Sequence, residues 1–410
     1  MWTKLLDVFV THLFRKGDFS LTYPDGTTRR YGDGGTPSVA MTLHDPALPR
    51  RIILSPELAV GEGYMDGTIT LADDDLRGFL SLAVDNIARQ GSPWFHRPLD
   101  LMRHASRWLK QFNPAKRARA NVAHHYDLSG ELYDLFLDKD RQYSCAYFAR
   151  PDMTLEEAQE AKKHHIARKL LLKPGMRVLD IGCGWGGMAL TLARDYGAHV
   201  VGVTLSEEQH ALATKRAAEA GLSDKVQFHL MDYRAVTGTF DRIVSVGMFE
   251  HVGVPHYREY FRNVHDLLSE DGVALIHTIG HTDPPGTTNP WILKYIFPGG
   301  YCPALSEATR AIEVNDLHSC DIEVWRLHYA ETLCHWYDRF MANIDRAREL
   351  YDDRFCRMWR YYLLACEATF RYNSQVVFQF QLSRRQDAVP LTRDYLYSDA
   401  AAEELRHAAE

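Results

Sequence analysis

The chain has 410 residues, of which 46% are hydrophobic and 25% are charged, so its composition is that of an ordinary soluble globular protein with room for two or three domains. The net charge of −7 disfavours general nucleic-acid binding. The seven cysteines include no Cys-x-x-Cys pair, which argues against a disulfide framework or a zinc site and fits a reducing cytosol.

The N-terminal segment predicts an amphipathic helix. Apolar residues between Trp2 and Phe14 are interrupted by Lys4, Asp7 and His12. Those polar interruptions are unlike a signal peptide, and no apolar run of the chain is long enough to span a bilayer.

A small α+β domain is expected to follow within residues 1–112. Short β-like runs occur at 20–23, 38–43 and 51–54, separated by turn signals rich in Gly, Pro and Asp. After three aspartates a helix is predicted over 76–89.

A basic segment closes this domain and leads into a linker, residues 113–122. Between Arg103 and Arg119 there are six basic residues and no acidic one, with Trp108, Leu109 and Phe112 among them. Such a segment suits an anionic lipid surface. It also suits a solvated helix followed by a linker, and the sequence leaves both interpretations open.

Strands and helices alternate through most of the second domain, residues 123–398, which predicts a doubly wound, mostly parallel α/β sheet of the Rossmann-like kind. The expected strands are 177–182, 199–204, 225–231, 241–246 and 272–279, and the expected helices are 155–172, 187–196, 207–221 and 256–268. Two further strands, 321–327 and 375–382, surround two long helices, 329–350 and 353–372. Residues 399–410 are expected to be a frayed tail.

The most informative stretch is the glycine-rich turn after the first of these strands. Gly182, Gly184 and Gly186 let the backbone approach a ligand closely, and Asp180 ends the strand. A dinucleotide site would need an acid at the end of the second strand, which instead reads Thr204-Leu205-Ser206. The acid lies before the glycines, and the region resembles S-adenosylmethionine-dependent methyltransferases. A purely structural glycine turn is the alternative.

Five more peptides extend the resemblance. They are Tyr143-Ser144-Cys145-Ala146-Tyr147-Phe148, Gly202-Val203-Thr204-Leu205-Ser206, Phe249-Glu250-His251-Val252-Gly253, His277-Thr278-Ile279-Gly280 and His328-Tyr329-Ala330-Glu331-Thr332-Leu333. In this order, across residues 115–390, the chain resembles the cyclopropane-fatty-acyl-phospholipid synthases and their mycolic-acid relatives. The stretch 61–67 resembles the members that act on phospholipids.

The resemblance implies a class I methyltransferase fold and two cofactors, S-adenosylmethionine and bicarbonate. Members of the family add a methylene to a cis double bond of an acyl chain, and the bicarbonate removes a proton. By resemblance the catalytic residues are Cys145, Glu250, His277, Ile279 and Tyr329. The cofactor-binding residues are Tyr143 and Ser144 at the methionine end, Asp180, Gly182, Gly184 and Gly186 along the body, and Thr204, Leu205 and Gln209 at the ribose and adenine.

These residue types suit the chemistry. An anion needs donors, which His277, Tyr329 and the backbone N–H groups of Cys145 and Ile279 can supply, while Glu250 can accept the bicarbonate proton. Aromatic faces stabilise a carbocation without trapping it, and the candidates are Tyr147, Phe148, Trp291, Tyr295 and Phe297.

Each of these residues also has a plainer interpretation. Cys145 alone would be a small buried hydrophobe, and Glu250 an ordinary helix cap. We interpret His124, His125, His164, His165 and His251 as structural or solvent-facing, because no metal-ligand spacing such as His-Glu-x-x-His occurs.

The resulting hypothesis is a cytoplasmic cyclopropane synthase that meets the inner face of the membrane peripherally and acts on unsaturated phospholipid acyl chains. A homodimer is consistent with the resemblance. Three rival functions stay open: a methyl- or methylene-branched product on the same lipids, methylation of a small soluble acceptor, and a non-catalytic lipid-binding protein.

Overall fold

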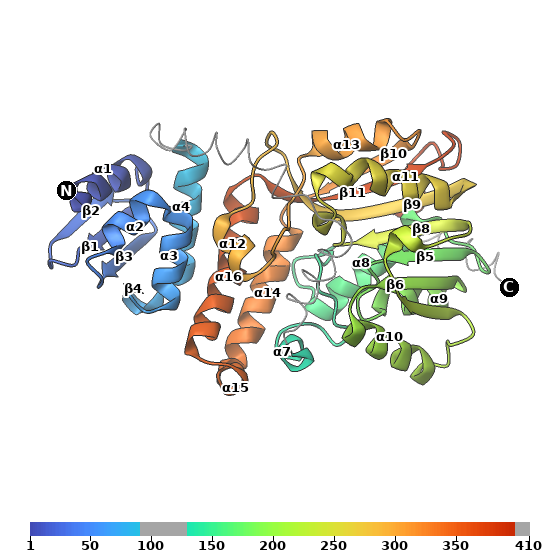
Figure 1. Cartoon of the computed structure of the whole chain (residues 1–410), viewed down its shortest axis with the longest axis horizontal. Helices are drawn as coiled ribbons and strands as arrows, with labels where there is room; N and C mark the ends of the chain where they lie inside the picture. Colours follow the sequence, from blue (N-terminus) through green and yellow to red (C-terminus); the bar gives the residue numbers. More distant parts are fainter. Residues whose placement is uncertain (91–128, 398–410) are drawn as a thin grey trace. The chain divides into compact units, whose positions relative to one another are not determined.

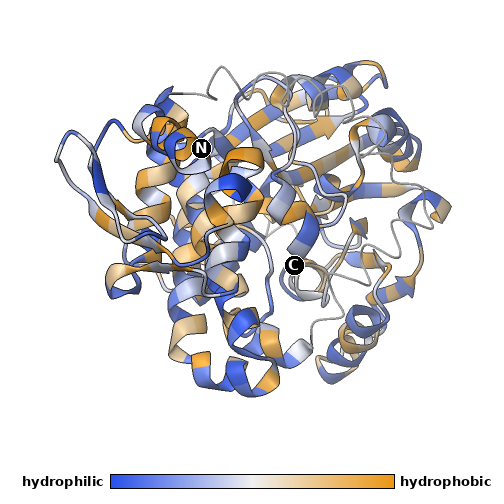
Figure 2. Cartoon of the chain, turned by 60° about the vertical axis from the view of Figure 1, so that its left-hand side comes forward, coloured by the Kyte–Doolittle hydropathy of each residue, from blue (hydrophilic) through white to orange (hydrophobic). Residues whose placement is uncertain are grey.

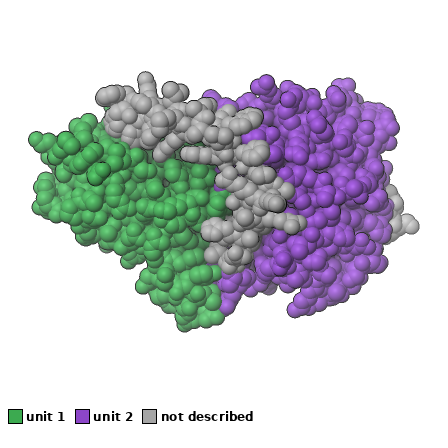
Figure 3. Space-filling model, in the orientation of Figure 1, with its two compact units in different colours: residues 1–107, 287–298, 330–374 green, residues 108–286, 299–329, 375–410 purple. Residues whose placement is uncertain are grey.

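The protein, seen here as a computed structural model, is described over residues 1–90 and 129–397, and its chain forms two compact units (Figure 3). Unit 1 comprises 1–107, 287–298 and 330–374, and unit 2 comprises 108–286, 299–329 and 375–410. The predicted basic segment, the linker at 113–122 and the tail at 399–410 lie outside the described residues.

Unit 1 begins with a helix and a four-stranded sheet of order β2-β1-β3-β4. Strand β1 pairs antiparallel with β2 and parallel with β3, and β3 pairs antiparallel with β4. The elements are α1 (Trp2–Leu13), β1 (Asp18–Thr22), β2 (Thr28–Gly32), β3 (Ser38–Leu43), α2 (Leu48–Leu54), α3 (Pro56–Met65), β4 (Ile69–Leu71), η1 (Ala72–Asp74) and α4 (Leu76–Gln90). The predicted helices at the N-terminus and at 76–89 are both confirmed.

One predicted strand of this unit is wrong. Residues 51–54 form the end of helix α2, which has a proline in its first turn. Proline suits that position because its N–H would have no helical partner there. Strand β2 was not predicted, and of its residues only Tyr31 is buried.

The rest of unit 1 comes from much later in the chain. Helix α16 (Asp353–Tyr372) packs against α4 and α3, and its Tyr361 ring lies 6.2 Å from that of Tyr64. Helix α12 (Pro290–Tyr295) packs on α3, where Trp291 covers Gly61. The predicted helix 329–350 is broken at Asn343 into α14 (His328–Ala342) and α15 (Ile344–Leu350).

Unit 2 contains a seven-stranded sheet of order β10-β11-β9-β8-β5-β6-β7 (Figure 1). Strands β5 to β9 pair parallel with one another, whereas β11 runs antiparallel to β9 and β10. The strands are β5 (Arg177–Ile181), β6 (His199–Thr204), β7 (Val226–Leu230), β8 (Phe240–Val246), β9 (Leu268–His281), β10 (His318–Trp325) and β11 (Gln375–Ser383). The predicted doubly wound, mostly parallel sheet is confirmed.

Helices cover both faces of this sheet. The α-helices are α7 (Gly130–Asp134), α8 (Leu155–Lys169), α9 (Gly187–Tyr196), α10 (Glu207–Glu219), α11 (Tyr257–Leu267) and α13 (Leu305–Glu313), and the short helices are η3 (Tyr233–Ala235), η4 (Phe249–His251), η5 (Val254–His256) and η6 (Asp394–Leu396). In the hydropathy colouring of Figure 2 the helices carry both polar and apolar residues, as expected when only one face packs on a core.

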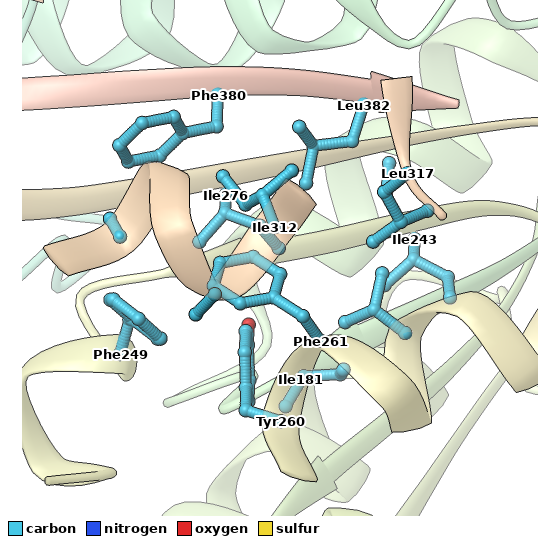
Figure 4. Close-up of a cluster of buried hydrophobic side chains, with 14 of the residues drawn as sticks. Ile181, Ile243, Phe249, Tyr260, Phe261, Ile276, Ile312, Leu317, Phe380 and Leu382 are labelled. Carbon is cyan, nitrogen blue, oxygen red and sulfur yellow. The ribbon is translucent and has the colours of Figure 1, made fainter. Parts of the chain in front are cut away.

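Successive residues of the strands are buried in two different hydrophobic clusters, one on each face of the sheet. Leu179 belongs to a cluster with α11 and α13, shown in Figure 4, whereas its neighbour Val178 belongs to a cluster with α8, α9 and α10. Successive side chains of a strand point to opposite faces, so a run of apolar residues fills both cores. The buried sheet fixes where its strands end, and those ends carry the site.

The structure also bears on membrane insertion. Among the described residues, no helix combines the length and apolar character that crossing a bilayer requires.

Candidate active site

A cavity opens at the carboxyl ends of β5, β6, β7 and β8, where open α/β sheets bind their ligands. It is lined by eight of the nine predicted cofactor residues: Tyr143, Ser144, Asp180, Gly182, Gly184, Thr204, Leu205 and Gln209. The structure therefore brings together peptides that are separated by up to 66 residues, as the sequence predicted.

Gly186 is the exception among the predicted cofactor residues. It does not line the cavity but precedes α9 with a φ of 83°, and a Cβ there would meet Phe228 at 2.7 Å and Ala213 at 3.0 Å. Its lack of a side chain allows close packing of the loop against Phe228 of β7 and Ala213 of α10. Gly182 has a φ of 80° and does line the cavity.

Asp180 supplies a buried carboxylate to the cavity wall. The residue is 2% exposed, and its Oδ2 has no hydrogen-bond partner among the described residues. Burial raises the pKa of the Asp180 carboxyl from 3.8 to about 7. A buried oxygen without a partner suits a cationic ligand group, and the amino group of a methionine moiety is such a group.

The second strand contributes polar groups that are already ordered. The Thr204 hydroxyl donates to Gln209 Oε1 at 2.8 Å, and Ser206 caps helix α10 by accepting from the Gln209 N–H. These bonds hold Gln209 at the cavity wall. Threonine and serine thus supply the polar groups at the end of β6, where a dinucleotide site would have an acidic residue.

Several cavity residues were not predicted from the sequence. Asp232 follows β7 and accepts from the Arg234 guanidinium at 2.6 Å, and both line the cavity with Tyr233. An acid directly after a strand was the signal that could have found them. His251 also lines the cavity, so the interpretation of it as structural or solvent-facing is wrong. Burial lowers the pKa of His251 to about 4, so its imidazole is neutral at pH 7.

Glu250 lies in η4, between the cavity-lining residues Met248 and His251. Its Oε1 accepts the backbone N–H of Ile279 at 2.7 Å, while its buried Oε2 has no partner in the described part of the chain. Burial raises the pKa of the Glu250 carboxyl to about 7. The backbone N–H of Ile279 thus binds Glu250 in this structure and is not left for an anion, which corrects the donor role assigned to it.

His277 and Ile279 are alternate residues of β9 and share one face of it. The His277 side chain is buried, and its Nδ1 lies 3.1 Å from Gln379 Nε2. Burial, with a contribution from the nearby Lys162 charge, holds the pKa of His277 well below its usual range. Because an amide nitrogen can only donate, Nδ1 accepts and the ring proton sits on Nε2.

Cys145 and Tyr329 are both buried. The Cys145 thiol donates to the Ala146 carbonyl at 3.3 Å. Tyr329 is the second residue of α14, as expected for a tyrosine at the start of that helix. The preceding His328 accepts the N–H of Phe148 at 3.1 Å.

The five candidate aromatic residues belong to different units. Tyr147 lies in unit 2, stacked between the rings of His165 and His328 at 4.5 and 4.9 Å, and Phe148 follows it. The other three, Trp291, Tyr295 and Phe297, lie in unit 1. There the Tyr295 hydroxyl donates to Glu62, a residue of the conspicuous 61–67 stretch.

The other histidines named above are placed as follows. His165 binds Glu323 at 2.7 Å, and His164 binds the Tyr196 hydroxyl, while His124 and His125 lie outside the described residues. His164 also groups with Glu160 and Asp195, whose ligand atoms lie within 4.8 Å of one another. Arg194 pairs with both carboxylates, so this group has the character of an ion-pair cluster.

Comparison with known proteins gives these observations a context. Residues 113–380 match the family model of mycolic acid cyclopropane synthetase, and residues 5–88 match a domain of unknown function, DUF7884. The chain is 40% identical over 354 residues to the cyclopropane-fatty-acyl-phospholipid synthase of Escherichia coli (strain K12), covering 85% of this chain and 89% of the relative.

Two further relatives are informative. The tuberculostearic acid methyltransferase UfaA1 of Mycobacterium tuberculosis is 36% identical over 409 residues, covering 93% of this chain and 90% of the relative. The crystal structure of mycolic acid cyclopropane synthase CmaA1 complexed with SAH and CTAB superposes with a TM-score of 0.62 at 36% identity, covering 66% of this chain and 99% of that one.

The fold and the cavity at its strand ends define an enzyme of the class I S-adenosylmethionine-dependent methyltransferases. Within that class, the chain belongs to the mycolic acid cyclopropane synthetase family, which includes the cyclopropane-fatty-acyl-phospholipid synthases.

Proposed function

We propose that the enzyme transfers a methylene from S-adenosylmethionine to the cis double bond of unsaturated phospholipid acyl chains and forms a cyclopropane ring. The observation that carries this proposal is Glu250, a buried carboxyl with one oxygen that has no partner in the described part of the chain, in the short helix that also supplies the cavity residue His251. The 40% identity to the E. coli cyclopropane-fatty-acyl-phospholipid synthase supports the choice of acceptor.

The proposed chemistry needs no nucleophilic side chain. The methyl group of the sulfonium is already electrophilic, so the alkene π electrons form a bond to that carbon and the sulfur leaves as a neutral thioether. The resulting carbocation must then lose a proton from the added methyl group, and the C–H electron pair closes the ring. What the protein has to supply is a proton acceptor at the methyl group and a dry pocket.

We further propose that Glu250, His277 and Tyr329 hold the bicarbonate implied by the family. Bound there, it would supply a base of suitable strength for the proton. His277 donates through Nε2–H because its Nδ1 faces Gln379, and Glu250 Oε2 is available to accept. A donor of this kind and an acceptor of this kind are the two groups that a bound bicarbonate needs, which supports the assignment.

A branched product is the second candidate. The similarity to the tuberculostearic acid methyltransferase UfaA1, which extends over 93% of this chain, favours it. The same cation would give a branch if its proton left from another carbon. The set of Glu250, His277 and Tyr329 favours ring closure, because bicarbonate bound by these residues would remove the proton from the transferred methyl group.

We also propose that the enzyme is cytoplasmic and forms a homodimer. We propose peripheral contact with the inner face of the membrane, supported by the start of the chain, where Met1 is 84% exposed and Leu5 and Val8 of α1 are 45% and 62% exposed. An exposed apolar stripe next to Lys4 suits a lipid interface.

The decisive test uses purified enzyme, S-adenosylmethionine and vesicles of a mono-unsaturated phospholipid. Proton NMR of the extracted lipid should show cyclopropane ring protons. Exocyclic methylene or methyl-branch signals would instead establish the second candidate. Turnover of a soluble acceptor with no change in the lipid would contradict both.

A further inference from the structure

A lysine without solvent contact lies behind the wall of the cofactor cavity. Lys162 of α8 is 0% exposed, and its Nζ donates to Gln142 Oε1 and to Ser144 Oγ, both at 2.7 Å. Gln142 and Ser144 both line the cavity. One turn earlier on α8, Gln159 donates to the carbonyls of the same two residues at 3.2 and 2.9 Å. Helix α8 thus holds this part of the wall through four hydrogen bonds.

The chemistry of the ammonium group decides what Ser144 can do. An ammonium group only donates hydrogen bonds, so Ser144 Oγ is an acceptor toward Lys162 and its own hydroxyl proton must point elsewhere. Ser144 is half-buried and lies on the cavity wall, so the cavity is where that proton can find a partner. Lys162 therefore turns Ser144 into a donor toward the ligand.

Lys162 is still mostly charged at pH 7, because its pKa stays above that value. Burial lowers the pKa of Lys162 to about 8, while the carboxylate of Asp138 acts in the opposite direction. Asp138 is itself buried and accepts the backbone N–H groups of Gln142 and Asp140. The adjacent Lys163 is paired with Asp140 and Glu160 at 2.8 and 2.7 Å, and Cys145 also lies nearby.

Burying a charged ammonium group lowers the stability of the fold, so a buried lysine behind a ligand site suggests a role in ligand binding. The group that this cation and the Ser144 hydroxyl would favour is an anion. The methyl donor has one such group, the carboxylate of its methionine part, whereas its sulfonium and amino groups are cationic. Asp180, elsewhere on the wall, suits the amino group.

We propose that Lys162 is a positioning residue that fixes Ser144 as a hydrogen-bond donor for the carboxylate of the methyl donor. This inference rests on the proposed placement of the methionine part at Tyr143 and Ser144. It does not depend on the acyl acceptor, because it concerns donor binding alone.

Two ligands separate this role from a structural one. S-Adenosylhomocysteine carries the carboxylate, and 5′-methylthioadenosine is the same nucleoside thioether without the amino-acid part. Calorimetric titration of the full-length protein should show Lys162→Met and Ser144→Ala binding S-adenosylhomocysteine about ten- to a hundredfold more weakly, the usual effect of losing a hydrogen bond to a charged group. Both should bind methylthioadenosine within about twofold of the wild type, since no charged hydrogen bond to it is lost.

The matched control is Lys163→Met, which removes a lysine buried to a similar degree one residue further along α8. It should affect the two ligands equally. If Lys162 acts through Ser144, the double variant should bind S-adenosylhomocysteine no more weakly than the weaker single variant.

Equal weakening of both ligands by Lys162→Met would overturn the proposal, as would additive losses in the double variant. If Lys162→Met fails to fold, Lys162→Gln takes its place, and a Ser144→Ala variant that binds S-adenosylhomocysteine like the wild type would be just as decisive against it. Normal donor binding with no lipid product would instead contradict the proposed function and leave this inference standing.

Discussion

Two buried carboxyl groups define the chemistry at the scale of single residues. Asp180 and Glu250 both have a pKa raised to about 7 by burial, and each has an oxygen without a partner among the described residues. Perturbed carboxyls of this kind are typical of functional sites. Their neighbours differ: Asp180 lies on the cavity wall, whereas Glu250 is tied to the backbone of β9 through Ile279. We therefore expect different defects from their loss.

Asp180→Asn should weaken S-adenosylmethionine binding by about ten- to a hundredfold, because a charged partner of the amino group is lost. The control is Asp241→Asn, at the opposite end of β8, where the carboxylate accepts the Arg177 N–H. Calorimetric titration of both variants checks the difference. Unchanged affinity of Asp180→Asn would rule out the assigned contact.

The same carboxyl predicts a pH dependence of stability. The pKa of folded Asp180, about 7, lies above its unfolded value of 3.8, so the charged form destabilises the fold above pH 7 and this cost disappears as the pH falls from about 7 to 4. Asp180→Asn should therefore raise the melting temperature of the ligand-free protein at pH 8 and have little effect at pH 4.5. If the wild type and Asp180→Asn had the same melting temperature at pH 8 as well as at pH 4.5, burial of the carboxylate would impose no such cost.

Glu250→Gln should leave donor binding within about twofold and lower turnover by about 10²- to 10⁴-fold, the usual range for a group that serves proton transfer. Glutamine keeps an oxygen for the Ile279 N–H, so the local backbone should be retained. Titration with S-adenosylmethionine and single-turnover assays on vesicles measure the two effects separately. Equal loss of binding and turnover would contradict the assigned role.

At the scale of elements, the glycine loop between β5 and α9 needs residues that tolerate a positive φ and, at one position, a residue without a side chain. Gly184 and Gly186 both have positive φ, 53° and 83°, but only Gly186 is crowded, by Phe228 and Ala213. Gly184→Ala should cost about 1–2 kcal/mol, the strain of the left-handed region. Gly186→Ala should cost about 1–3 kcal/mol more from overpacking. Chemical denaturation of the ligand-free protein tests the ranking, and equal losses would show that the contact relaxes.

Most elements of unit 2 could be predicted because they rest on local signals. Apolar runs such as Val178–Ile181 are buried on both faces of the sheet, and Thr154 and Ser206 cap the helices that follow them. The site positions at strand ends follow from the parallel order of the sheet.

The misses have physical reasons that a sequence does not display. Residues 51–54 have a strand-like composition but continue a helix that starts near Pro49. Gly186 and Gly184 look alike in the motif, and only the packing of Phe228 separates their roles. His251 seemed structural because nothing in its own peptide shows that η4 turns it to the cavity.

At the scale of the whole molecule, the least predictable feature was which segments of the chain make up unit 1. The proposed boundaries, a small domain at 1–112 and a catalytic domain at 123–398, follow the order of the chain, whereas residues 287–298 and 330–374 pack into unit 1. Helix α16 meets α4 across more than 260 residues of sequence, and no local pattern encodes such a contact. The boundaries remain a prediction.

The exposed stripe of α1 gives a prediction for membrane contact. Leu5→Asp with Val8→Asp should lower binding to anionic vesicles by at least about tenfold, since two apolar groups no longer enter the lipid. The control is Leu391→Asp, a fully exposed leucine of unit 2. Vesicle sedimentation measures both. Equal binding of all three proteins would remove α1 from the membrane contact.

Methylene addition to membrane lipids can be measured by mass spectrometry of lipids from a bacterial host that lacks cyclopropane fatty acids and expresses this chain. We expect mono-unsaturated acyl chains to gain one CH₂ unit, and Glu250→Gln to abolish most of this gain. Unchanged lipids, in cells whose purified protein is folded and binds S-adenosylmethionine, would contradict the proposed activity on phospholipids and point to a different methyl acceptor.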